Sequence, residues 1–103
     1  MKTVTICGSM RFEKLMREVA YKLETEQGYN VLQCVYGDGS SLTKQQLDNL
    51  VAAHYKKIDL SDAIYVVNPG GYIGESVKRE IEYTGALGKE IIYMERSHDS
   101  RYI

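Results

Sequence analysis

Short apolar runs alternate with longer amphipathic stretches along this chain. Four runs are rich in β-branched and other apolar residues and end at glycine or polar turns: residues 3–7, 30–36, 63–67 and 90–94. Runs of this length and composition are typical of β-strands, and those that are apolar throughout indicate burial on both faces. We therefore predict four strands, at least partly enclosed by helices.

Three amphipathic helices are predicted between these strands. The first has apolar residues three and four positions apart, at Phe12, Leu15, Met16, Val19, Ala20 and Leu23. The second begins near Thr43, and its apolar stripe comprises Leu47, Leu50, Val51, Tyr55 and Ile58. The third covers about residues 75–87, with its inward face at Val77, Ile81, Thr84 and Leu87. Stripes of this kind allow a helix to pack on a sheet.

The regular alternation of strands and helices defines an α/β chain with a parallel sheet. Right-handed crossovers favour a three-layer flavodoxin- or Rossmann-like fold, with four strands in the order 2-1-3-4 and helices on both faces. We expect one domain over residues 1–103. In such sheets ligands bind beyond the carboxyl ends of the strands where the connections diverge. Here the segments 7–11 and 68–76 meet at that point.

Composition narrows the range of partners. The 103 residues carry a formal net charge of −1, which argues against a nucleic-acid polymer as partner, because polyanions favour basic surfaces. No apolar run approaches the roughly 18 residues of a membrane span, and the first residues lack a signal-peptide pattern. We expect no membrane association and a cytoplasmic location. Cys7 and Cys34 are too few for a disulfide framework and are expected to be buried, reduced residues on strands.

The loop after the first strand has residues that suit an anion. Gly8 permits close approach to the backbone, Ser9 offers a hydroxyl and Arg11 a cationic fork, with Met10 between them. Free amides at the start of the following helix add to the attraction for a phosphate or carboxylate. The alternative is an ordinary turn with a serine cap. The loop is neither a dinucleotide fingerprint nor a Walker loop.

The loop after the third strand is rich in glycine and leads directly into a helix. Its candidate ligand contacts are Asn68, Gly71, Gly74 and Ser76. Such a turn can wrap a sugar or a phosphate, and a tight turn with a capping serine is the alternative.

Two ionisable residues on helices are the candidate chemical groups. Glu80 follows Val77 by three positions, which places its carboxylate beside the buried stripe near the expected site. A carboxylate there can act as a nucleophile or as an electrostatic stabiliser. His54 lies on the apolar stripe of the second helix and can either handle a proton or be a core histidine. The two histidines and two cysteines lack metal-ligand spacing, so no metal and no cofactor is expected.

Three segments together resemble the nucleoside 2-deoxyribosyltransferase family, and within it the 2′-deoxynucleoside 5′-monophosphate N-glycosidases. These segments are TICGSMR at residues 5–11, KIDLSDAIYVVN at residues 57–68 and EIEYTGALGKEI at residues 80–91. They occur in the family's order and span most of the chain. The resemblance identifies residues 1–103 as a single domain of this type.

The resemblance implies an activity and a set of roles. Glu80 falls on the family's nucleophile, which attacks the anomeric carbon of a nucleoside 5′-monophosphate and displaces the base. Water then completes hydrolysis, or a second base completes transfer. The turn containing Ser9 and Arg11 matches the family's 5′-phosphate site. A small-molecule nucleotide or nucleoside is the implied substrate, and a homodimer is the expected assembly.

The sequence departs from the family pattern at three places. His54 stands where the family has an aspartate that contacts or protonates the leaving base, and Thr5 stands where it has a tyrosine. Only residues 95–103 follow the last predicted strand, whereas the family chain continues further. A nucleotide-binding or sensing domain without catalysis is therefore the second hypothesis, and an interaction module without a ligand is the third.

Overall fold

A computed structural model describes residues 1–96 of the chain. The strands are β1 (Thr3–Gly8), β2 (Asn30–Leu32), β3 (Ala63–Val67) and β4 (Glu90–Tyr93). The helices are α1 (Glu13–Gln27), α2 (Lys44–Leu60) and α3 (Glu75–Ala86), with single 3₁₀ turns η1 (Met10–Phe12) and η2 (Pro69–Gly71).

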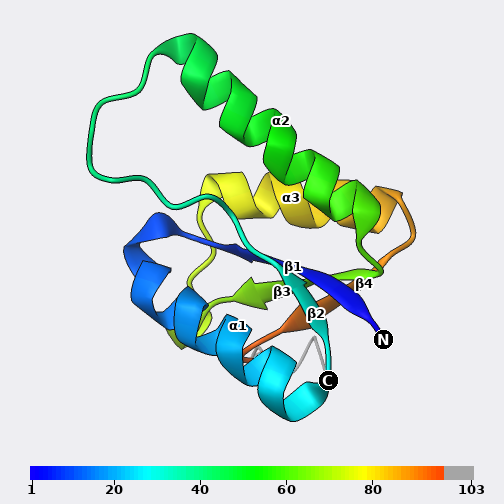
Figure 1. Ribbon diagram of the computed structural model, residues 1–103. Coiled ribbons are helices and arrows are strands. Elements are labelled where there is room, and N and C mark those ends of the chain that lie inside the picture. The colour runs from blue at the N-terminus through cyan, green and yellow to red at the C-terminus, as the bar shows by residue number, and fades with distance from the viewer. Residues whose placement is uncertain (97–103) are drawn as a thin grey trace.

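The four strands form one parallel sheet in the order β2-β1-β3-β4, which confirms the predicted α/β fold and strand order. Helix α1 covers one face of the sheet, and α2 and α3 cover the other (Figure 1). Because β1 and β3 are central and pair from Val4↔Ala63 to Gly8↔Val67, their carboxyl ends lie side by side. The loops that follow them meet at this edge, as the strand order requires.

Alternation along β1 sends successive side chains to opposite layers. Ile6 packs with Met16 on the α1 side, whereas Cys7 packs with Ile58 and Val77 on the side of α2 and α3. Ile6 and Cys7 are both fully buried. The two-residue period of a strand therefore aims the last buried side chain of β1 at the gap between α2 and α3.

The local signals that begin and end helices are mostly those expected. Thr43 caps α2 with a capping box that includes Gln46, and Gly28 ends α1 in the left-handed conformation. No helix within residues 1–96 is long and apolar enough to cross a membrane.

The second predicted strand is shorter than its apolar pattern indicates. The pattern predicts residues 30–36, but β2 ends at Leu32, because its pairing with β1 ends at Thr5. The chain then leaves the sheet as a long connection to α2 (Figure 1). Cys34 therefore lies in this connection and is half-buried, whereas Cys7 is fully buried as expected.

Part of the apolar stripe predicted to face inward is exposed. Leu47 and Val51 on α2 are 52% and 49% exposed, and Leu87 after α3 is 45% exposed. The amino-terminal half of α2 projects past the edge of the sheet, so only its carboxyl-terminal half, around Ile58, reaches the core (Figure 1). The helical period correctly predicted the helix, but the sheet is too narrow to cover its whole apolar stripe.

Candidate functional site

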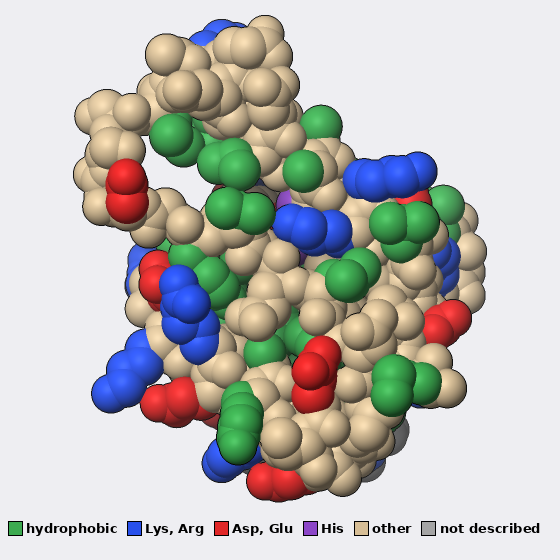
Figure 2. Space-filling model, viewed as in Figure 1, with side chains coloured by type: hydrophobic (Ala, Val, Ile, Leu, Met, Phe, Trp, Pro, Cys, Tyr) green, Lys and Arg blue, Asp and Glu red, His purple; other side chains and the backbone are tan. Residues whose placement is uncertain are grey.

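A cavity of about 580 Å³ opens at the carboxyl edge of the sheet, between the loop after β1 and the helices α2 and α3. Figure 2 shows the surface hollowed beneath the projecting part of α2, with hydrophobic side chains gathered along the hollow. The volume lies within the usual range for small-molecule sites. Its position is the one predicted from the strand order.

Most of the predicted site residues line this cavity. Those that do are Gly8, Ser9, Met10, His54, Gly74, Ser76 and Glu80. Arg11, Asn68 and Gly71 do not. The structure thus brings together the two candidate chemical groups and the first part of the anion loop.

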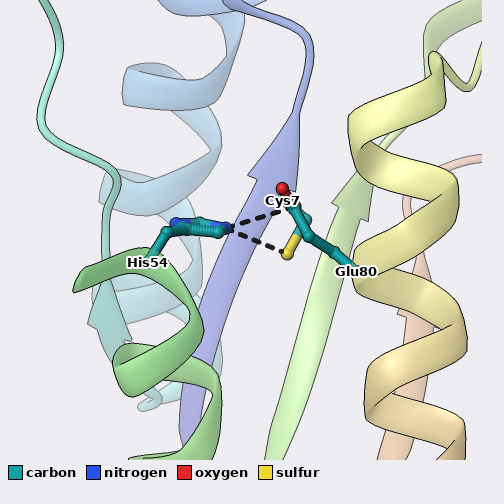
Figure 3. Close-up of side chains that lie close together, drawn as sticks. All are labelled: Cys7, His54 and Glu80. Carbon is teal, nitrogen blue, oxygen red and sulfur yellow. Dashed lines mark hydrogen bonds and ion pairs between the residues drawn. The ribbon is translucent and has the colours of Figure 1, made fainter. Parts of the chain in front are cut away.

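Glu80 and His54 face each other across the cavity wall. Oε1 of Glu80 lies 3.2 Å from Nε2 of His54, and the two side chains are 14% and 13% exposed. His54 comes from α2 and Glu80 from α3, and both reach toward the end of β1 (Figure 3). The spacing prediction that Glu80 points toward the site agrees with this placement.

Cys7 is the third member of the same cluster. Its Sγ lies 3.5 Å from Nε2 of His54, directly beneath the Glu80 carboxylate (Figure 3). Burial, and then the nearby Glu80 carboxylate, raise the pKa of the Cys7 thiol well above its ordinary value. Both effects favour the protonated thiol over the thiolate in the metal-free protein, which argues against a nucleophilic Cys–His pair.

The partners of His54 favour one of its two neutral tautomers. A carboxylate only accepts hydrogen bonds, so the tautomer that satisfies Glu80 has its proton on Nε2. Among residues 1–96, Nδ1 of His54 is a buried polar atom with no hydrogen-bond partner. The contacts of the imidazole with Glu80 and with Cys7 therefore both converge on Nε2.

The loop after β1 is shaped by packing as well as by its position at the cavity. A Cβ on Gly8 would lie 2.7 Å from Sδ of Met16 and 3.3 Å from the carbonyl oxygen of Val67. Glycine is thus required here by close approach of protein atoms. Ser9 caps η1, and its hydroxyl accepts a bond from the Arg11 amide at 3.4 Å.

Arg11 lies at the rim rather than in the cavity. Its guanidinium stacks over the ring of Tyr72, 4.4 Å from the ring centre, and Tyr72 in turn lines the cavity. The guanidinium would have to leave this ring to reach a ligand beside Ser9.

The loop after β3 divides into a structural part and a part that reaches the site. The Asn68 side chain donates to the backbone carbonyl of Glu95 and accepts from its amide, both at 2.9 Å, which ties the loop to the chain after β4. Gly71 is exposed at φ 82° in η2. Gly74 begins α3 as its N-cap, so Ser76 is not the capping residue that the turn alternative proposes.

Two of the departures from the family pattern concern Thr5 and the end of the chain. The Thr5 hydroxyl pairs with Ser61 Oγ at 2.6 Å in the buried core, and Thr5 does not line the cavity. Residues 97–103, including His98, lie outside the described residues.

Several lining residues were not singled out from the sequence. Two are cations, Lys57 and Arg79, and the others are mostly apolar residues of α2 and the connection before it, including Cys34, Val35, Leu42, Leu50 and Tyr55. Arg79 follows the candidate Ser76 on α3 by three positions, and Lys57 follows His54 by three positions, so helical spacing from the candidate residues was the available signal. Nothing in the sequence placed the 33–43 connection over the site.

No protein-family model and no curated protein matches this chain. A solved structure described as a conserved protein from Enterococcus faecalis V583 superposes on it with a TM-score of 0.62 and 15% sequence identity. The match covers 98% of this chain and 70% of that chain. Likeness at this identity shows a shared α/β fold with a four-stranded parallel sheet, and nothing about activity.

Proposed function

We propose that this protein cleaves the N-glycosidic bond of a nucleoside 5′-monophosphate, with Glu80 as the nucleophile. The observation that carries the proposal is the Glu80 carboxylate, held by His54 at the wall of a cavity at the carboxyl edge of β1 and β3. This is also the residue that the sequence resemblance assigns to the nucleophile. A cavity of about 580 Å³ accommodates a ligand of nucleotide size.

The proposed reaction proceeds in two steps at the anomeric carbon. Glu80 forms a bond from its carboxylate oxygen to this carbon as the bond to the base breaks, through an oxocarbenium-like transition state. In its imidazolium form, His54 gives its proton to the departing base. In the second step, water attacks the glycosyl ester and the neutral imidazole accepts the water proton, which restores both residues. A second base in place of water gives transfer.

The phosphate of the substrate is proposed to lie at the loop after β1. Ser9 lines the cavity there, and Arg11 reaches the same place if its guanidinium leaves Tyr72. Arg79 and Lys57 supply further positive charge along the wall. These groups favour a nucleotide over a free nucleoside because charge-assisted bonds to phosphate are strong.

The proposal includes a homodimer that acts in the cytoplasm without a cofactor. Leu47 and Val51 on the projecting half of α2 are exposed and line the outer part of the cavity, and they offer an apolar surface for a second copy. Size-exclusion chromatography with light scattering tests the assembly.

A nucleotide sensor without catalysis is the second candidate. It is favoured by the stacking of Arg11 on Tyr72 at the rim, since displacement of this contact by a phosphate would convert binding into a movement of the loop. An interaction module without a ligand is the third hypothesis, and it has no specific support.

The deciding experiment is incubation of the purified protein with a panel of ribo- and 2′-deoxyribonucleoside 5′-monophosphates and the matching nucleosides. Chromatography would detect free base, and calorimetry would detect binding. Base release from a monophosphate supports the enzyme. Binding without turnover of any member supports the sensor. If neither base release nor binding is detected, both proposals lose their support.

A further inference from the structure

Three donor atoms of different chemistry converge at the wall of the cavity. Nε2 of His54 lies 3.5 Å from Sγ of Cys7 and 3.2 Å from Oε1 of Glu80 (Figure 3). All three donor atoms lie within 4.8 Å of one another. We propose that Cys7, His54 and Glu80 form a binding site for a transition-metal ion, and that Zn²⁺ is the ion that fits it best.

The separations agree with those between ligands of a tetrahedral zinc ion. Bonds of about 2.3 Å to sulfur, 2.0–2.1 Å to nitrogen and 2.0–2.2 Å to oxygen place the sulfur about 3.5 Å and the oxygen about 3.4 Å from the nitrogen. The distances in the structure, 3.5 Å and 3.2 Å, differ from these by no more than a few tenths of an ångström. Both contacts of His54 therefore already have nearly the spacing of zinc ligands.

Two donor atoms of the cluster lie against the same nitrogen of His54. Nε2 of His54 carries at most one proton, yet both the thiol of Cys7 and the carboxylate of Glu80 lie against it. A cation placed among the three would attract all three donors at once. The three residues come from three separate elements, β1, α2 and α3, so no single helical or strand spacing explains their convergence.

The cavity provides a route for the ion and an open coordination position. His54 and Glu80 line the cavity, and Cys7 closes the cluster from the sheet, where it is fully buried. An ion held by three protein ligands would present its fourth position to the cavity, the arrangement of catalytic zinc sites. Binding displaces the thiol proton to solvent. Sulfur and imidazole ligands favour Zn²⁺ and Co²⁺ over Mg²⁺ and Ca²⁺.

This inference goes beyond the proposed glycosidase and does not rest on it. A zinc ion would occupy the Glu80 oxygen that the nucleophile needs, so metal and sugar exclude each other. If both proposals hold, Zn²⁺ inhibits base release and a chelator restores it. Metal binding is measured without nucleotide, so its failure is distinguishable from failure of the enzymatic proposal.

The test uses Zn²⁺ and Co²⁺ alone on the chelator-treated full chain. Calorimetry is expected to show one Zn²⁺ per chain and no response to Mg²⁺. Co²⁺ is expected to give a sulfur-to-cobalt charge-transfer band and the strong visible bands of tetrahedral coordination. Cys7→Ser and Glu80→Gln should each weaken Zn²⁺ binding by about 100-fold or more, since changes outside the ligand sphere already cost 10–100-fold.

Cys34→Ser is the matched control, because Cys34 lines the same cavity but lies outside the three-donor cluster. It should retain the affinity and the cobalt spectrum. Circular dichroism verifies folding, and Glu80→Gln keeps the test decisive if the buried Cys7→Ser substitution unfolds the chain. The proposal is overturned if wild type binds Zn²⁺ no more tightly than Glu80→Gln. It is also overturned if the cobalt complex has no sulfur-to-cobalt charge-transfer band, or if Cys34→Ser removes that band.

Discussion

His54 and Glu80 meet with Nε2 and Oε1 3.2 Å apart, which joins α2 to α3 above the carboxyl end of β1. The two residues are separated by 26 positions in the chain, and each lies on a different helix. Their contact therefore depends on how α2 and α3 pack on the same face of the sheet. It places one imidazole and one carboxylate at a shared cavity, the two groups that the proposed reaction needs.

Glu80→Gln is expected to lower the rate of base release by about 1,000-fold or more, about 4 kcal/mol of barrier, because the variant loses the nucleophile but keeps its shape. Glu82→Gln is the control: Glu82 is two positions further along α3, exposed, and outside the cavity lining. Steady-state kinetics on the best monophosphate of the panel measures both. A Glu80→Gln enzyme that retains activity would contradict the assignment.

A 2′-fluoro-arabino substrate tests the covalent step separately. The fluorine destabilises the oxocarbenium-like transition states, so the glycosyl ester should accumulate on wild type. Intact mass spectrometry would detect it, and peptide mapping should place it on the segment containing Glu80. An adduct on any other segment would exclude Glu80 as the nucleophile.

His54→Gln is expected to reduce the rate most on substrates with poor leaving bases, by about 100- to 10,000-fold for general acid catalysis. The physical reason is that a good leaving base departs without a proton, whereas a poor one requires it. Rates on a series of bases of graded acidity give this dependence. If thermal stability falls while kcat is unchanged on every base, His54 is a core histidine and has no catalytic role.

Arg11→Ala is expected to raise the KM for a nucleoside monophosphate about 10-fold or more and to leave reaction of the free nucleoside nearly unchanged. A charge-assisted bond to phosphate is worth about 1.5–3 kcal/mol, and each 1.4 kcal/mol is a factor of ten. Arg17→Ala is the matched control, because Arg17 also stacks on a tyrosine, but its partner Tyr36 does not line the cavity, whereas Tyr72 does. Equal losses on both substrates would remove the phosphate assignment.

Gly8→Ala is expected to destabilise the fold by about 1–3 kcal/mol, as overpacking does. The new Cβ would lie 2.7 Å from Sδ of Met16 and 3.3 Å from backbone oxygen of Val67, and the backbone atom yields least. Gly85→Ala is the control, because its Cβ meets no atom within 4 Å in the helix α3, where alanine is favoured. Urea denaturation measures the stability of both variants. A Gly8→Ala midpoint equal to that of wild type would show that the contact at Gly8 relaxes without cost.

The sequence by itself determined the element types, the parallel sheet and the strand order, because these depend on local periodicity and on the handedness of crossovers. The same rules placed Ser9 and Glu80 at one edge of the sheet, since strand order fixes which loops meet. The direction of Glu80 also followed from helical spacing relative to Val77. These predictions needed no knowledge of which side chains touch.

Only the tertiary structure decided the composition of the cluster and the extent of the elements. Cys7 joins His54 and Glu80 because strand alternation and the packing of two helices coincide at one point, and no sequence spacing encodes that coincidence. The stripe at Leu47 and Val51 has the period of a buried face but lies beyond the edge of a narrow sheet. Arg11 stacks on Tyr72 because an exposed side chain takes whichever nearby partner its rotamers reach, and local pattern does not specify that choice.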